Sequence, residues 1–281
     1  MLSRPEFFES EPIPSPEPVG QLEPSKNGAI VVKIGGSTLG SHDTTLEDLI
    51  ALQREGIQPI VIHGGGKVIT DWMEKQGVRA RFVKGLRVTD EASLDIVVAV
   101  LTGLINKQLV SAILSLGGKT VGMSGVDGGI LQGEILDPEL GYVGKVTQVN
   151  PEPIQAVVDA GFMPVIAPVA VRLGGDGTTL LNVNADTAAG EIAATLGVKK
   201  LVFMTDVEGV LDSSRRLIPR ITERQAKSLM SSNVIAGGMI PKIGACLQNV
   251  GQGRMTHIID GRKPHALRSI VEGETLGTRV G

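Results

Sequence analysis

The order of short apolar runs and longer amphipathic stretches constrains the fold of this chain most strongly. From Ala29 onward, runs rich in Val and Ile, such as AIVVKI and PIVIH, alternate with stretches whose apolar residues recur at helical spacing. Strands that alternate with helices are typical of βαβ units, in which the strands pair in parallel. The sequence therefore predicts an α/β fold built on a parallel sheet.

The same pattern gives approximate bounds for most elements. Strands are expected at residues 29–34, 59–63, 119–123, 141–149, 163–169, 200–205 and 255–260, and a hairpin at 81–89 that turns near Gly85. Helices are expected at about 46–55, 68–75, 91–116, 153–159, 185–196, 223–230 and 239–250. We expect one continuous sheet with two functional lobes and a soft boundary at 173–179, where glycines interrupt the alternation.

Composition limits the class of protein. The 281 residues are 42% hydrophobic but only 2% aromatic, so aliphatic side chains must form the core, as in buried parallel strands. The net charge is −3 and basic residues are scattered, which argues against nucleic acid or an anionic membrane as partner. The single cysteine, Cys246, excludes an intramolecular disulfide and fits a cytoplasmic protein. No apolar run approaches the ~18 residues of a membrane span, so we expect a soluble chain.

Residues 1–27 differ from the remainder of the chain. They are dense in Pro and Glu, and we expect a disordered or loosely docked tail. The folded region is expected to cover 28–281. The pair Phe7 and Phe8 has an alternative interpretation as a contact with a partner subunit, although isolated aromatic residues in such segments are usually without a role.

Residues 61–68, VIHGGGKV, place three glycines between an apolar run and the start of an amphipathic stretch. Glycine has no Cβ, so a ligand can approach its backbone closely, and successive N–H groups at the start of a helix can bind an anion. Open parallel sheets bind ligands beyond the carboxyl ends of their strands. The motif therefore predicts a binding site for negative charge at Gly64, Gly65 and Gly66.

A second glycine pair follows the first expected strand. In VVKIGGS, Lys33 lies inside the strand, and Gly35 and Gly36 come directly after it. A buried ammonium group without a partner is costly, so a lysine in an apolar strand needs an explanation. Either its side chain reaches the site that the glycines line, or the strand lies at a sheet edge and the lysine extends to water. The motif alone leaves both interpretations open.

Several familiar active-site motifs are missing from the sequence. GxxxxGK[ST] is absent and HGGGKV is not GxGxxG, which disfavours a P-loop NTPase or a dinucleotide-dependent oxidoreductase. HGGG also occurs in lipases and esterases, but these require a GxSxG motif that the chain lacks. The four histidines show no zinc-ligand spacing, and we expect His63, before the glycine loop, to be structural.

Six motifs in order carry a family resemblance: VKIGGS, HGGGKV, FVKGLRVTD, LNVNAD, TDVEGVLD and GGMIPK. Together they resemble the amino-acid kinase superfamily and, within it, the N-acetylglutamate kinases, over nearly all of the chain except the tail. The resemblance implies a three-layer αβα sandwich around a mainly parallel open sheet. It also implies an acetylglutamate-binding and dimerisation lobe at about 28–174 and an ATP-binding lobe at about 175–281. The implied activity is ATP-dependent phosphorylation of the γ-carboxylate of N-acetyl-L-glutamate, a step of arginine biosynthesis.

The resemblance assigns the catalytic roles to three residues. Lys33 and Lys242 match the lysines that flank the transferring phosphoryl group, and Asp186 matches the aspartate that orients both. These residue types suit phosphoryl transfer, which is catalysed mainly by positioning and by stabilisation of charge. Taken alone, Lys242 is equally typical of a solvated helix, and Asp186 of a carboxylate at a helix N-terminus.

The resemblance also implies the substrate-binding residues. Arg87 and Asn182 match the pair that holds the α-carboxylate of N-acetylglutamate, and arginine can bind a carboxylate through two parallel hydrogen bonds. Gly65 and Gly66 would donate backbone N–H groups to the substrate or to the migrating phosphate. Without its motif, Arg87 would be interpreted as a surface charge.

ATP is expected over the C-terminal half. By resemblance, the nucleotide would contact Gly35, Gly36, Thr205, Asp206, Val207, Gly209, Val210, Gly237, Gly238 and Met239. Mg²⁺ would bridge the β- and γ-phosphates and be held mainly by phosphate oxygens and water, so we predict no protein metal ligand.

Two alternatives remain open at this stage. Within the fold, the main alternative is another acyl-phosphate or carbamate kinase, particularly one that acts on carrier-protein-bound aminoadipate or glutamate. A catalytically silent amino-acid sensor would also share the fold. Arginine-inhibited relatives carry an amphipathic N-terminal helix that links dimers into a hexamer, whereas prolines interrupt this extension. We therefore predict a homodimer with weak or no arginine feedback. A PII-type regulator binds some relatives, and nothing in the sequence establishes that surface.

Overall fold

The computed structural model describes residues 28–35, 44–83, 85–173, 179–235, 237–250 and 253–281. Its central sheet is formed by β1 Ala29–Ile34, β2 Gln58–His63, β5 Thr120–Ser124, β8 Met163–Ala167, β11 Lys200–Thr205, β12 Arg220–Ile221, β13 Met255–Asp260 and β14 Thr278–Val280. The eight strands run in the order β12-β14-β13-β11-β1-β2-β8-β5. Every pairing is parallel except that between β13 and β14. The prediction of a mainly parallel sheet is confirmed.

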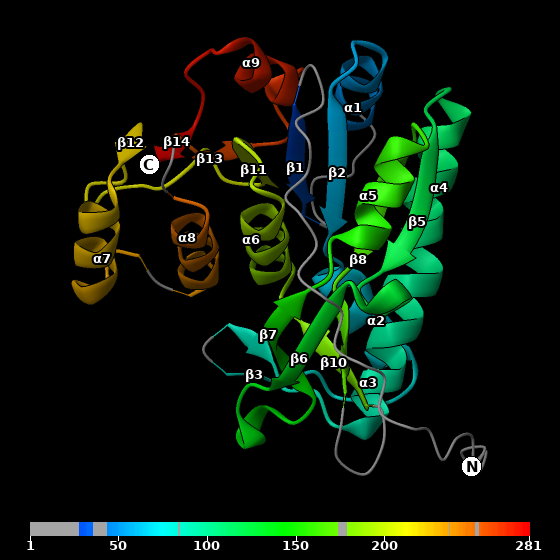
Figure 1. Cartoon of the computed structure of the whole chain (residues 1–281). Coiled ribbons are helices and arrows are strands. Elements are labelled where there is room, and N and C mark those ends of the chain that lie inside the picture. The colour runs from blue at the N-terminus through cyan, green and yellow to red at the C-terminus, as the bar shows by residue number, and fades with distance from the viewer. Residues whose placement is uncertain (1–27, 36–43, 84, 174–178, 236, 251–252) are drawn as a thin grey trace.

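Helices cover both faces of this sheet (Figure 1). They are α1 Thr45–Arg54, α2 Gly66–Lys75, α3 Glu91–Val98, α4 Asn106–Ser115, α5 Glu152–Asp159, α6 Ala185–Leu196, α7 Glu223–Ser231, α8 Met239–Gln248 and α9 Ala266–Glu272. Alternate residues of each strand point to opposite faces. In β1, Val31 packs in the core that contains α5, α6 and α8, whereas Ile30 and Val32 pack in the core that contains α1 to α4 and α9. The three-layer αβα architecture follows from this division.

A second sheet contradicts the expectation of one continuous sheet. Four shorter strands form it: β6 Leu131–Ile135, β7 Val143–Val149, β9 Val169–Arg172 and β10 Thr179–Val183. They close into a small barrel in the order β10-β7-β6-β9, which lies beyond the lower end of the main sheet in Figure 1. The stretch 163–169 does not form one strand because Pro168, which has no N–H to donate, separates β8 from β9. Residues 174–178 of the predicted boundary lie outside the described residues.

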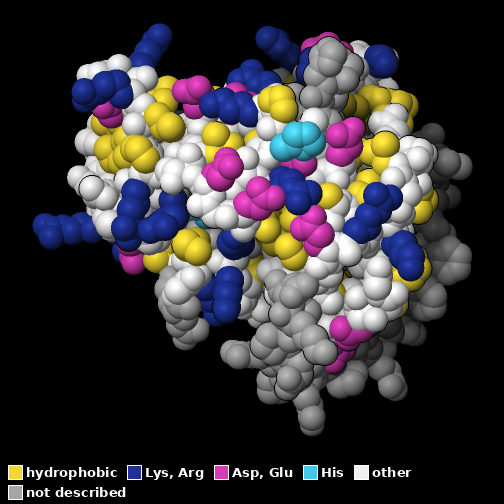
Figure 2. Space-filling view, turned by 90° about the horizontal axis from the view of Figure 1, so that it is seen from above, with side chains coloured by type: hydrophobic (Ala, Val, Ile, Leu, Met, Phe, Trp, Pro, Cys, Tyr) yellow, Lys and Arg dark blue, Asp and Glu magenta, His cyan; other side chains and the backbone are white. Residues whose placement is uncertain are grey.

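The remaining elements are short. The predicted hairpin is present as β3 Phe82–Val83 and β4 Leu86–Arg87, and 3₁₀ turns form at Asp127–Gly129 and Pro138–Leu140. On the face drawn in Figure 2, basic and acidic side chains are interspersed.

The long helix predicted at 91–116 is present with one irregularity. It begins after Asp90, whose carboxylate accepts a hydrogen bond from Ser93 N–H, and it contains a π-helical segment at Ala99–Ile105 between α3 and α4. By length and composition alone, Glu91–Ser115 passes as a membrane span. Core helices of globular proteins pass the same test, and buried residues such as Val97 and Ile113 pack this helix into the core.

Candidate active site

Lys33 lies at the centre of the main sheet. Strand β1 pairs with β11 on one side and with β2 on the other, so the alternative of a lysine at a sheet edge is wrong. Lys33 occupies the same face of β1 as Val31, two residues earlier, and this face packs against α6 and α8. Its side chain is therefore buried among elements that also supply charged partners.

Those partners are Asp186 and Lys242. Asn184 caps α6 by accepting hydrogen bonds from the N–H groups of Asp186 and Thr187, which fixes the first turn of the helix and its carboxylate. Lys33 Nζ lies 2.9 Å from Asp186 Oδ1, and Lys242 Nζ donates to Asp186 Oδ2 at 2.9 Å. The three residues are only 9%, 7% and 8% exposed, so the solvated alternative for Lys242 is wrong.

The charges of the three residues depend on one another. Burial lowers the pKa of Lys33, and Asp186 opposes this shift by favouring the ammonium form. Burial alone would raise the pKa of Asp186, but the two ammonium groups outweigh burial and hold this pKa below its ordinary value. With Asp186 ionised and both lysines protonated, the group has one excess positive charge, which suits it to contact an anion.

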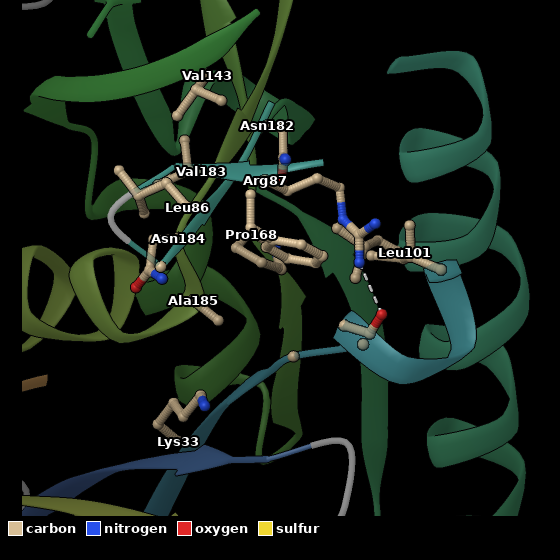
Figure 3. Close-up of a pocket in the computed structure, with 16 residues that line it drawn as sticks. Lys33, Leu86, Arg87, Leu101, Val143, Pro168, Asn182, Val183, Asn184 and Ala185 are labelled. Atoms are coloured by element: carbon tan, nitrogen blue, oxygen red, sulfur yellow. Dashed lines mark hydrogen bonds between the residues drawn. The ribbon is translucent and has the colours of Figure 1, made fainter. Parts of the chain in front are cut away.

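Lys33 also faces a cavity of about 230 Å³ between the carboxyl ends of the central strands and the second sheet. Figure 3 shows Lys33 and Arg87 approaching this cavity from opposite sides. The cavity is lined by Lys33, Gly64, Gly65, Gly66, Ile69, Phe82, Gly85, Leu86, Arg87, Leu101, Val143, Pro168, Asn182, Val183, Asn184 and Ala185. The structure therefore places the predicted Lys33, Gly65, Gly66, Arg87 and Asn182 around one space.

The glycine loop forms one wall of the cavity. Gly64 N–H donates to Ile34 O at 2.9 Å, which ties the loop to β1. Gly65 precedes α2, and a Cβ added to it would lie 2.9 Å from Leu101 Cδ2, so a larger residue would not fit without movement. Among the described residues, no side chain caps α2 and Gly65 N–H has no acceptor. The loop thus presents amide donors to the cavity, as an anion site requires.

Arg87 closes the cavity opposite Lys33. It is buried rather than at the surface, so the alternative of a surface charge is wrong. Its Nη2 donates to Gly66 O at 2.8 Å and to Thr70 Oγ1 at 2.9 Å, and its guanidinium stacks 4.7 Å from the centre of the Phe82 ring. Burial lowers the pKa of Arg87. These contacts fix the guanidinium in one orientation at the cavity wall.

Asn182 is linked to Arg87 by a residue that the motifs did not identify. Asn182 Nδ2 donates to Thr89 Oγ1 at 2.9 Å, and this hydroxyl donates to Arg87 O at 3.0 Å. Thr89 is fully buried. Thr89 lies in the motif FVKGLRVTD, two residues after Arg87, and this position was the signal from which the sequence could have identified it.

The residues predicted to contact the nucleotide do not line this cavity. Thr205 ends β11, and the other residues of this group, Asp206, Val207, Gly209 and Val210, follow it. Gly209 has φ +151°, and Val210 N–H donates to Thr278 Oγ1 at 2.8 Å. Gly237, Gly238 and Met239 lead into α8, the helix of Lys242, and Gly35 follows β1 directly. Gly36 lies outside the described residues.

One contact joins the two groups of predicted binding residues. Gly85, at the tip of the β3–β4 hairpin, has φ +82°, and a Cβ added there would lie 3.5 Å from the backbone carbon of Gly237. The hairpin that supplies Arg87 therefore reaches the glycines that precede α8.

Comparison with known proteins identifies the family. The model of the amino acid kinase family matches residues 28–260. The chain belongs to the amino acid kinase family. An acetylglutamate kinase of Dehalococcoides mccartyi is 45% identical over 259 residues, 91% of this chain and 95% of the relative. An acetylglutamate kinase of Caldanaerobacter subterraneus is 46% identical over 90% of this chain and 87% of the relative.

Solved structures share the architecture of this amino acid kinase family member. The crystal structure of smu.665 from Streptococcus mutans has a TM-score of 0.77 and 30% identity. The alignment covers 90% of this chain and 98% of the other. Carbamate kinase from Giardia lamblia bound to AMP-PNP has a TM-score of 0.66 at 14% identity, which supports the fold alone. Its alignment covers 90% of this chain and 98% of the other.

Proposed function

We propose that this amino acid kinase family member is an ATP-dependent N-acetyl-L-glutamate 5-kinase. It transfers the γ-phosphoryl group of ATP to the γ-carboxylate of N-acetyl-L-glutamate and forms N-acetyl-L-glutamyl 5-phosphate, a step of arginine biosynthesis. The observation that carries this proposal is the buried group Lys33–Asp186–Lys242 beside a cavity whose other walls are glycine amides and Arg87. The relatives named acetylglutamate kinase support the choice of substrate.

The chemistry requires charge stabilisation and no general base. A carboxylate is already an anionic nucleophile at neutral pH, so no proton has to be removed before it attacks the γ-phosphorus. Lys33 and Lys242 neutralise negative charge on the transferring group, and Asp186 holds both ammonium groups in place. His63 is neutral, since burial lowers its pKa to about 4, and we assign it no proton transfer.

Substrate recognition divides between opposite walls of the cavity. Arg87 and Asn182 bind the α-carboxylate at one side, and the N–H groups of Gly65 and Gly66 bind the γ-carboxylate or the migrating phosphoryl group. Because Arg87 and Lys33 approach the cavity from opposite sides, one end of the substrate is recognised by Arg87 and the other end reacts near Lys33. In this proposal about residues 28–174, together with Asn182, form the substrate lobe, and most of about 175–281 forms the ATP lobe.

ATP would bind along Thr205–Val210 and Gly237–Met239, with its phosphates toward Gly35 and Lys242. Mg²⁺ would accompany the nucleotide and neutralise phosphate charge. Both oxygens of Asp186 are already held by lysines. The cation would be held mainly by phosphate oxygens and water rather than by a protein cage.

A coupled assay of ADP release tests the proposal against its alternatives. The purified chain is offered N-acetylglutamate, aspartate, glutamate or UMP with MgATP, and turnover of N-acetylglutamate is expected. Absence of turnover with N-acetylglutamate would reject the proposed substrate, and the carrier-protein-bound aminoadipate or glutamate becomes the next one to test.

Two variants distinguish a kinase from a silent sensor. Lys33→Met or Lys242→Met should lower kcat by on the order of 10² or more, because each removes a charge that stabilises the transition state. Unchanged kcat in both variants would contradict these assignments.

We further propose a cytoplasmic homodimer with weak or no feedback by arginine. Sedimentation of the full chain should give a dimer, and a hexamer would refute this assembly. We assign no surface of this chain to a PII-type regulator.

A further inference from the structure

His63 ends β2 directly before the glycine loop, and the reaction proposed above gives it no role. Its side chain is fully buried. The ring contacts two groups: Nδ1 lies 3.1 Å from Gly64 O, and Nε2 lies 3.2 Å from Asn106 Nδ2. The imidazole therefore bridges the peptide that opens the loop and a residue of α4.

The contacts of Asn106 determine which ring nitrogen carries the proton. Asn106 Nδ2 donates to Val165 O at 2.8 Å and to Met123 O at 3.1 Å, and Lys107 Nζ donates to Asn106 Oδ1 at 3.0 Å. Carbonyl oxygens only accept and an ammonium group only donates, so the amide orientation is fixed. The amide nitrogen has two protons for three neighbours, Val165 O, Met123 O and His63 Nε2, so at least one proton is shared. Because this nitrogen cannot accept a hydrogen bond, Nε2 cannot be the donor. The proton of the neutral ring then lies on Nδ1.

This tautomer orients the glycine loop. Nδ1–H donates to Gly64 O, which holds that carbonyl on the side of the imidazole. The Gly64–Gly65 peptide is trans, so its N–H points away from the ring. Gly65 N–H has no acceptor among the described residues, and Gly64 and Gly65 both line the cavity with Lys33. The imidazole thus determines where an amide donor of the anion site points.

The π-helical segment brings the second residue to this position. Asn106 follows Ala99–Ile105 directly, and Leu101 and Ile105 of this segment are the side chains nearest to Gly65. A π-helical turn accommodates an extra residue and is frequent at functional sites. Here it lets one stretch of helix both pack against Gly65 and direct Asn106 to His63.

We propose that His63 and Asn106 are positioning residues, which fix the Gly64–Gly65 peptide so that the Gly65 N–H points toward the phosphoryl group in transfer. This inference rests on the proposed function for the identity of the anion, but the tautomer and the peptide orientation do not depend on the substrate. Neither residue contacts the reacting atoms. Their effect on the reaction is exerted through one backbone amide.

Two substitutions separate positioning from a merely structural role. His63→Asn places an amide nitrogen where Nδ1 lies and keeps a donor for Gly64 O, but it loses the contact with Asn106. His63→Gln places an amide oxygen where Nε2 lies and keeps that contact, but it loses the donor. We expect kcat to fall about tenfold or more in His63→Gln and to stay within about threefold of wild type in His63→Asn. KM for N-acetylglutamate should change less than kcat in His63→Gln.

Stability should follow the opposite order. The urea midpoint is expected to fall at least as far in His63→Asn as in His63→Gln, because only the former loses the contact between residue 63 and Asn106. Thr120→Val is the matched control. Thr120, on β5 and outside the cavity, is buried, and its hydroxyl donates to Met163 O at 2.7 Å. Its replacement should lower the urea midpoint without lowering kcat. Losses of kcat that follow the urea midpoints in both His63 variants would overturn the proposal.

A spectroscopic measurement on the wild-type chain needs no substrate. Long-range ¹H–¹⁵N spectra of ¹⁵N-histidine-labelled protein distinguish the two neutral tautomers, and the His63 signal is the one lost in either variant. A neutral ring with its proton on Nδ1 is expected, and Asn106→Asp should move the proton to Nε2. A wild-type proton on Nε2 would overturn the inference even if N-acetylglutamate is turned over. Failure of that turnover alone would refute only the proposed substrate.

Discussion

Replacing Asp186 by Asn tests whether the buried charges are organised as described. The substitution preserves shape but leaves Lys33 and Lys242 without their shared counter-ion. At 2.9 Å and an effective dielectric constant of about 20, each contact has a gross attraction of about 6 kcal/mol, most of which offsets desolvation. Breaking a buried pair by removing one partner costs about 3–5 kcal/mol. We expect Asp186→Asn to lower the free energy of unfolding by that amount, a large share of the 5–15 kcal/mol typical of a domain.

The pH dependence of this loss has a definite sign. Asp186 raises the pKa of Lys33, so its removal lets burial lower that pKa further. A lysine whose pKa is lower in the folded than in the unfolded state binds fewer protons when folded, so stability rises with pH between the two values. The deficit of the variant should therefore shrink as pH increases from 7 toward about 10. It should also shrink as the pH falls below about 4, because Asp186 of the unfolded wild type takes up a proton there while the folded carboxylate, whose pKa is lowered, stays ionised.

Urea unfolding at pH 7 and pH 9.5 measures the loss of stability and its decrease at higher pH. Glu223→Gln is the matched control, because its 2.6 Å pair with Lys227 is mostly exposed, and it should cost less than about 0.5 kcal/mol. A deficit below about 1 kcal/mol for Asp186→Asn at pH 7 would refute the argument. So would a deficit that is equal at the two pH values.

Two further predictions concern the cavity walls. Arg87→Lys should raise KM for N-acetylglutamate about tenfold in steady-state assays, because one ammonium group cannot replace a planar fork; an unchanged KM would remove Arg87 from the site. Gly65→Ala should lower kcat about tenfold or more, because the new methyl group meets Leu101 Cδ2 at 2.9 Å and displaces the loop; wild-type kcat would show that the loop tolerates movement.

The sequence was sufficient to predict six of the eight strands of the main sheet and several residues that line the cavity, for identifiable reasons. Strands β11 and β13 and helix α6 have the predicted bounds, because aliphatic runs and an Asn cap mark their ends clearly. Strand β6, LQGEI, was missed because glycine and polar residues remove the apolar signal, and Pro168 separates two strands that read as one run. The second sheet depends on pairing between distant segments, which local patterns do not specify.

The same limit explains which site residues were found. Lys33 could be selected because an ammonium group inside an apolar strand demands a partner. The family motifs implied Asp186 as that partner, and the packing of α6 brings the two groups to 2.9 Å. Asn106 is a polar residue within an apolar helical stretch, which was a detectable signal. Its target was not detectable, because the π-helical segment changes the direction of every side chain that follows it.

The alternation of side chains between the two faces of the sheet explains how Lys33 and His63 are held. Ile34 of β1 is the neighbour of His63 in β2, and Ile34 packs on the face covered by α1 to α4, whereas Lys33 points to the face covered by α6 and α8. One helical layer therefore anchors Lys33 through Asp186, and the opposite layer anchors His63 through Asn106. The site between the ends of β1 and β2 is held from both faces of the sheet. Loosening either layer should then misalign a different donor, a side-chain ammonium group in one case and a backbone amide in the other.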